Sequence, residues 1–126
     1  MWPFKSSSND SGSGRAKPAQ SQQSVCAEFG AAFVLPHPDS KAGIAVGTLQ
    51  TLPLNALRHP VQNGTCGWYI WGGELTDAVD FQPYCVHHIS DHCPSLIPYL
   101  ALAPGWRVLL APGQTEVWYD AALLNV

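Results

Sequence analysis

The segment from Cys66 to Trp71 constrains the fold of this chain more than any other. Successive side chains of a β-strand point to opposite faces of a sheet, and here both faces are apolar: Cys66, Trp68 and Ile70 on one side, Gly67, Tyr69 and Trp71 on the other. A strand that is apolar on both faces is covered by other elements on both sides. The sequence therefore predicts a β-strand in the interior of a sheet, ended by a pair of glycines.

The rest of the chain predicts a small sheet with a few helices. Further strands are predicted from apolar, β-branched or alternating residues at 25–35, 43–49, 106–110 and 116–119. The last two are expected to form a hairpin, because a Pro-Gly pair between them is typical of a tight turn. Helices are predicted at 84–93 and 94–102, whereas several prolines predict an irregular segment over 51–65. The expected fold class is α+β, a mainly antiparallel sheet with one or two helices packed on one face.

Residues 1–24 differ from the remainder in composition. They are rich in Ser, Gly and Gln, and such a segment buries too little apolar area to offset the entropy lost on ordering. We therefore predict a disordered polar tail over 1–24 and a single domain over 25–126. No apolar stretch typical of a secretion signal follows Met1, and none approaches the roughly 18 residues of a membrane span. A cytoplasmic protein without a membrane span is expected.

Charge excludes one class of function. Only 12% of the residues are Asp, Glu, Lys or Arg, about half the usual share. Residues 25–126 hold three Lys or Arg and eight Asp or Glu, a net charge of −5. A nucleic-acid-binding protein needs a face rich in Lys and Arg, so nucleic acid is not expected as a partner. An acidic domain favours a basic partner.

One cluster of residues indicates possible chemistry. Cys85, His88 and His92 would share one face of the predicted helix, and all three are zinc-ligand types. A structural zinc site needs a fourth ligand, and the same face is equally consistent with a packed, half-buried helix. A metal- or thiol-dependent enzyme or sensor that uses this cluster stays an alternative. The four cysteines are expected to be free thiols, and no cofactor is predicted.

Aromatic and acidic residues indicate a surface that binds a protein. An exposed Trp beside acidic residues is typical of an interaction hot spot, and the acids would steer a basic partner. The residues predicted to bind a partner are Trp71, Glu74, Asp77, Asp80, Glu116 and Trp118. Arg107 is expected to pair with Glu74 or Glu116 across the sheet or, alternatively, to reach a carboxylate of the partner. The sequence contains no phosphate-binding loop, dinucleotide fingerprint or nucleophile elbow, and a non-enzymatic protein is predicted.

Several segments together resemble a known family. They are Asn-Gly-Thr-Cys-Gly-Trp-Tyr-Ile-Trp-Gly-Gly-Glu at 63–74, His-His-Ile at 87–89, Pro-Ser-Leu-Ile-Pro-Tyr-Leu-Ala-Leu at 94–102, Pro-Gly-Trp-Arg-Val-Leu-Leu at 104–110 and Glu-Val-Trp-Tyr-Asp at 116–120. As a set they are similar to the immunity-protein domain numbered thirty-three among the immunity families of bacterial polymorphic-toxin systems, over about residues 25–126.

The resemblance implies a non-enzymatic module that neutralises a cognate toxin by stoichiometric binding, and the acidic domain favours a basic toxin domain as that partner. It carries over no catalytic residues. A small structural adaptor, tethered by its tail to a larger assembly, stays a further alternative. The sequence does not indicate the oligomeric state.

Overall fold

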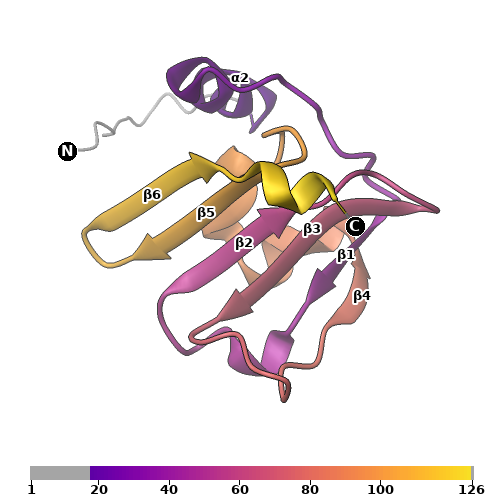
Figure 1. Cartoon of the computed structure of the whole chain (residues 1–126), viewed down its shortest axis with the longest axis vertical. Coiled ribbons are helices and arrows are strands. Elements are labelled where there is room, and N and C mark those ends of the chain that lie inside the picture. The colour runs from indigo at the N-terminus through magenta and orange to yellow at the C-terminus, as the bar shows by residue number, and fades with distance from the viewer. Residues whose placement is uncertain (1–17, 126) are drawn as a thin grey trace.

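The protein is built on one six-stranded β-sheet. The computed structural model describes residues 18–125 (Figure 1). Its strands are β1 (Lys41–Ile44), β2 (Leu54–Arg58), β3 (Thr65–Gly72), β4 (Gln82–Cys85), β5 (Trp106–Ala111) and β6 (Gln114–Tyr119), arranged in the order β4-β1-β3-β2-β5-β6. Neighbours β1 and β3 run parallel, and the other neighbouring pairs are antiparallel. The predicted α+β fold class is confirmed.

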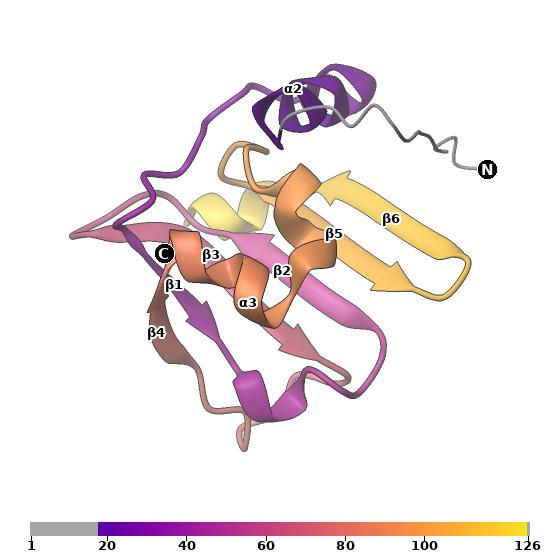
Figure 2. The ribbon, with the colours of Figure 1, turned by 180° about the vertical axis from the view of Figure 1, so that it is seen from behind.

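Helical segments cover one face of this sheet. The helices described are α2 (Pro18–Phe29), η1 (Val46–Thr48), η2 (Val86–His88), α3 (Ile89–His92), η3 (Pro94–Tyr99) and η4 (Ala121–Leu124). Of these, η4 lies on the opposite face, where its Leu123 is buried with Leu57 and Trp71. Figure 2 shows α3 and the helical turns that follow it lying across the sheet, with α2 beyond one end. The Gln22 amide joins α2 to η3 by donating to the Ile97 carbonyl at 2.8 Å. We call this side of the sheet the covered face.

The core lies between the covered face and these helices. Strand β3 is third in the sheet, and its Trp68 and Ile70 are at most 1% exposed, so the predicted interior strand is confirmed. Trp68 packs in the same cluster as Leu96 of η3, and its indole Nε1 donates to the Leu100 carbonyl at 2.9 Å. The apolar face of β3 that carries Trp68 and Ile70 therefore forms one side of the main core.

A cation is buried in this core without an acidic partner. Arg58 is 0% exposed. Its guanidinium donates to four backbone carbonyls, those of Val34 at 2.6 Å, Leu102 at 2.8 Å, Cys66 at 2.9 Å and Leu100 at 3.4 Å. Burial lowers the pKa of Arg58. The side chain ties the segment after α2 and the segment after η3 to the sheet.

Two predictions at the N-terminal end are wrong. A strand was expected over 25–35, but α2 continues to Phe29. Gln22, Val25 and Cys26 are buried on one side of this helix, which is helical spacing. Residues 18–24, assigned above to the polar tail, form the first part of the same helix. Residues 1–17 lie outside the described part of the chain.

Three other boundaries also differ. The strand expected over 43–49 is displaced, since β1 spans Lys41–Ile44 and Val46–Thr48 form the helical turn η1. Residues 51–65 were expected to be irregular, yet β2 runs from Leu54 to Arg58 because the prolines flank that strand instead of interrupting it. A helix was expected over 84–93, but Tyr84 and Cys85 belong to β4, where they pair with Ala42 and Lys41 of β1. The helical part begins only at Val86. Strand pairing to β1 thus overrides the local helical pattern.

Candidate partner-binding face

The side of the sheet opposite the covered face carries three of the six predicted partner-binding residues. Residues that pair directly across strands point to the same face, and the register defines two rows. One row contains Gly43, Tyr69, Leu57, Arg107 and Trp118, and the other contains Trp71, Asn55, Leu109 and Glu116. We call this surface the open face. It brings Trp71, Glu116 and Trp118 together on one side of the sheet.

The open face is partly covered at one end by a second, smaller apolar cluster. Trp71, Leu57 and Leu123 are buried together there, and Tyr69 and Phe81 pack against them. Phe81 belongs to the segment between β3 and β4, and its ring meets those of Tyr69 and Trp71 nearly at right angles, with centroids 5.4 and 6.1 Å away. Edge-to-face contacts of this kind stabilise aromatic clusters. The segment after β3 is thereby folded back over the sheet.

Trp71 is part of this support. It is only 4% exposed, and its Nε1 donates to the Gly73 carbonyl at 3.1 Å. Its predicted exposure at the surface is therefore wrong. The alternating pattern placed Trp71 correctly on the second face, but it did not show that Phe81 would return to cover the ring.

A hollow of about 380 Å³ opens on the open face beside this cluster. Aromatic and apolar side chains dominate its walls: Leu57, His59, Tyr69, Trp71, Leu75 and Phe81. The His59 ring is held by a 2.9 Å contact between its Nδ1 and the Leu123 carbonyl of η4. Of these residues, only Trp71 was predicted to take part in binding. For Leu75 and Phe81, the sequence signal was the presence of large apolar side chains in a segment that also contains several acidic residues.

The far side of the open face carries the second predicted tryptophan. Trp118, on edge strand β6, is 38% exposed, as predicted. The guanidinium carbon of Arg107 lies 5.4 Å from the centroid of the Trp118 ring, which is within the range of a cation–π contact. The same guanidinium contacts the Asp120 carboxylate at 3.2 Å. The predicted pairing of Arg107 with Glu74 or Glu116 is wrong, because Asp120 follows β6 directly beside it.

The predicted acids lie around the open face. Glu74, Asp77 and Asp80 are exposed on the segment between β3 and β4, and Glu116 is exposed on β6. The structure describes three Lys or Arg residues: Lys41, the buried Arg58, and Arg107, which is paired with Asp120. The open face thus combines apolar surface with a largely unneutralised acidic border.

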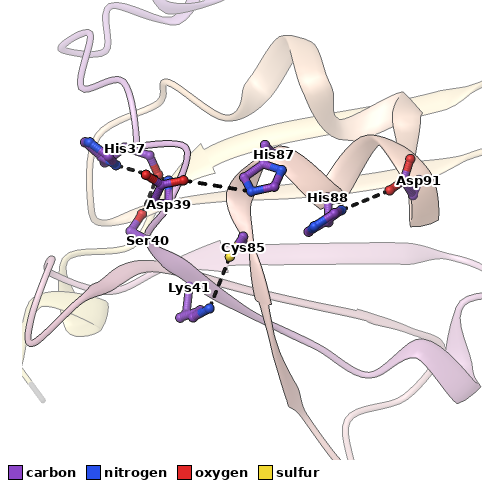
Figure 3. A network of polar contacts seen from close by, with 8 residues as sticks. All are labelled: His37, Asp39, Ser40, Lys41, Cys85, His87, His88 and Asp91. Carbon is purple, nitrogen blue, oxygen red and sulfur yellow. Dashed lines mark hydrogen bonds and ion pairs between the residues drawn. The ribbon is translucent and has the colours of Figure 1, made fainter.

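The alternative metal cluster does not assemble. Among the described residues, no group of three or more His, Cys, Asp or Glu is placed to hold a metal ion. Figure 3 shows the Cys85 sulfur next to the Lys41 ammonium and His88 turned to Asp91. The His92 ring packs on Tyr84, with centroids 4.7 Å apart. The prediction of a shared helix face is wrong, since Cys85 belongs to a strand.

The cysteines are free thiols, as predicted. Cys26, Cys66 and Cys93 are buried, and burial raises the pKa of each, that of Cys93 to about 11. A buried, protonated thiol is a poor nucleophile. Cys85 is half-buried and differs from the other three in this respect.

Comparison with protein families assigns the domain. The model of the Imm33-like domain family matches residues 21–120. The chain belongs to the Imm33-like domain family. The match includes both tryptophans of the open face and all of its predicted acids, so the candidate site lies wholly within the Imm33-like domain. The resemblance identified from the sequence is confirmed.

The family name groups the Imm33-like domain with immunity proteins, which act in general by binding a protein and not by catalysis. Searches of curated proteins and of solved structures found no significant match. Within the described residues, no helix has both the length and the apolar character needed to cross a lipid bilayer.

Proposed function

We propose that this chain is an immunity protein that neutralises a cognate bacterial toxin by binding it stoichiometrically through the open face. The observation that carries the proposal is the contrast between the two sides of the sheet. One side is sealed by helices, and the other presents a hollow, the exposed Trp118 and a border of exposed acids. An apolar centre with a charged rim is the usual anatomy of a protein-binding surface.

Each part of the open face has a role in this proposal. Glu74, Asp77, Asp80 and Glu116 steer a basic toxin domain towards the face and speed its association. Trp118 is the aromatic anchor, because exposed Trp is enriched among residues that dominate binding energy. Trp71 acts indirectly, since it forms the buried floor on which Phe81 and the acidic segment rest.

Co-expression tests the biological half of the proposal. A toxin encoded by the gene beside this one is expressed in a sensitive cell, with and without the full chain. We expect growth to be restored by the wild-type chain and lost again with the double variant Glu116→Lys and Trp118→Ala. The matched control is Glu28→Lys, which makes the same charge change on helix α2, on the covered side. Growth restored equally by all three chains would contradict a role for the open face.

Direct binding tests the physical half. The full chain is immobilised, the purified toxin domain is passed over it, and the dissociation constant is measured at two salt concentrations. We expect a one-to-one complex that weakens as salt rises, because solvent-exposed charges are screened. Restored growth without any complex would show that the protection does not come from binding, and the proposal would fail.

A further inference from the structure

A second site lies at the other edge of the sheet, away from Trp118. Lys41 of β1 and Cys85 of β4 are paired residues in the antiparallel register. The Lys41 Nζ lies 3.1 Å from the Cys85 Sγ, as Figure 3 shows. Strand β4 is an edge strand of the sheet, Lys41 is exposed and Cys85 is half-buried. A primary amine and an accessible thiol are therefore held in contact by the fold.

This contact separates Cys85 from the other cysteines. Cys26, Cys66 and Cys93 are at most 4% exposed, and their buried thiols are shielded from oxidants in solution. Cys85 is half-buried, and Lys41 is exposed. Cross-strand partners lie close enough for their side chains to touch without backbone movement. A bond between the two side chains therefore requires only small torsional changes.

We propose that Cys85 and Lys41 form an oxidative modification site, at which peroxide joins the two side chains through a sulfur–nitrogen bond. In the first step, the Cys85 thiol is oxidised by hydrogen peroxide to sulfenic acid, which releases one water. In the second, the Lys41 amine gives its proton to solvent and attacks the sulfenic sulfur. A nitrogen–sulfur bond forms, the sulfur–oxygen bond breaks, and a second water leaves. Sulfenic acids condense with nitrogen in this way.

Atoms and electrons balance in this reaction. One thiol, one amine and one peroxide give one sulfenamide and two waters, and the peroxide accepts the two electrons that the sulfur loses. The link joins β4 to β1 and so fixes the strand that follows Phe81, a residue of the open face. The modification is independent of the proposed function and can succeed or fail without it.

Mass spectrometry of the full chain tests the site. The reduced chain is treated with one to a few equivalents of hydrogen peroxide, and the intact mass is compared with that of Cys85→Ser and Lys41→Arg. For the wild type we expect a loss of about two mass units, for the two hydrogens removed, and reversal by dithiothreitol. Trypsin should no longer cut after Lys41, because a modified lysine is not recognised.

The two variants serve as controls with different outcomes. Neither residue belongs to the buried core, so circular dichroism should show an unchanged fold. Cys85→Ser should keep the reduced mass at this peroxide dose. Lys41→Arg keeps the charge but cannot capture the sulfur, and Cys85 should instead gain one or two oxygens, about 16 or 32 mass units. Dimedone, which traps sulfenic acid, should label Cys85 more strongly in this variant than in the wild type.

Three results would overturn the proposal. The first is a wild-type chain in which Cys85 gains oxygen while trypsin still cuts fully after Lys41. The second is a cross-linked peptide that retains an oxygen, which would exclude the direct sulfur–nitrogen bond. The third is a link formed by Lys41 with any other cysteine.

Discussion

The two faces of the sheet use the same residue types for different purposes. On the covered face, Trp68 is 1% exposed and its indole nitrogen is bonded to a backbone carbonyl. On the open face, Trp118 is 38% exposed, and its ring contacts the cation of a neighbouring strand. The arginines differ in the same way. Arg58 is buried in the core, whereas Arg107 is paired with the partly exposed carboxylate of Asp120.

This difference indicates where stability and recognition reside. Removing a side chain from the covered face leaves a cavity or unpaired carbonyls, which is costly. Removing an exposed side chain such as Trp118 from the open face leaves contacts that water can replace. We therefore expect substitutions on the covered face to act on folding and those of exposed residues on the open face to act on binding.

The largest effect on stability is expected for Trp68→Ala. Truncation of a fully buried Trp typically costs about 3 to 5 kcal/mol of unfolding free energy, which is a large share of the stability of a small domain. Urea unfolding followed by circular dichroism measures it. An effect below about 1 kcal/mol would show that Trp68 is not part of a tight core.

Arg58→Leu should follow closely. The substitution removes a buried cation and leaves the carbonyls of Val34, Cys66 and Leu102 without their donor. We expect a loss of about 3 kcal/mol, because each unpaired buried polar group costs roughly 1 to 3 kcal/mol and the core relaxes in part. The same unfolding experiment measures it. Stability at or above that of the wild type would mean that burying the charge costs at least as much as its hydrogen bonds contribute.

Alkaline pH gives a more selective test of the covered face. Burial raises the pKa of Cys93 from 9.0 to about 11. Between these pH values the unfolded chain loses this proton and the folded chain keeps it, so stability falls as pH rises. Between these pH values, we expect the free energy of unfolding to fall by roughly 2 kcal/mol more in the wild type than in Cys93→Ala. Parallel curves for the two proteins would contradict the burial of this thiol.

Trp118→Ala should have the smallest effect on folding. The residue lies on an edge strand and is partly exposed, and surface substitutions usually change stability by less than about 0.5 kcal/mol. The measurement is the same urea titration as for Trp68→Ala, which makes the two a matched pair. A loss similar to that of Trp68→Ala would remove the distinction between the two faces.

The sequence predicted the elements that depend on local pattern. The strand from Cys66 to Trp71 was recognisable because both of its faces are apolar, and the C-terminal hairpin was recognisable from its turn. Elements set by distant contacts were missed. Strand β2 is flanked by prolines and becomes a strand through pairing with β3 and β5, and Tyr84 and Cys85 become a strand through pairing with β1.

The candidate site was predicted in a similar way. The two tryptophans and the acids were identified from composition and from their positions near strand ends. That Trp71, Glu116 and Trp118 lie on one side of the sheet follows from the strand register, which the sequence does not reveal. The burial of Trp71 depends on Phe81, ten residues further on. The partner of Arg107 depends on the turn of the chain after β6. Neither can be deduced from the neighbours of those residues in the sequence.

Hydrogen–deuterium exchange on the complex with the toxin domain distinguishes which side of the sheet binds the toxin. The full chain, free and bound, is labelled for increasing times, and protection is mapped along the sequence. We predict that binding slows exchange in residues 73–81 and in β6, while α2 and η3 exchange as they do in the free chain. Protection confined to α2 and η3, with no change at 73–81 or β6, would show that the toxin binds the covered side. It would contradict binding through the open face.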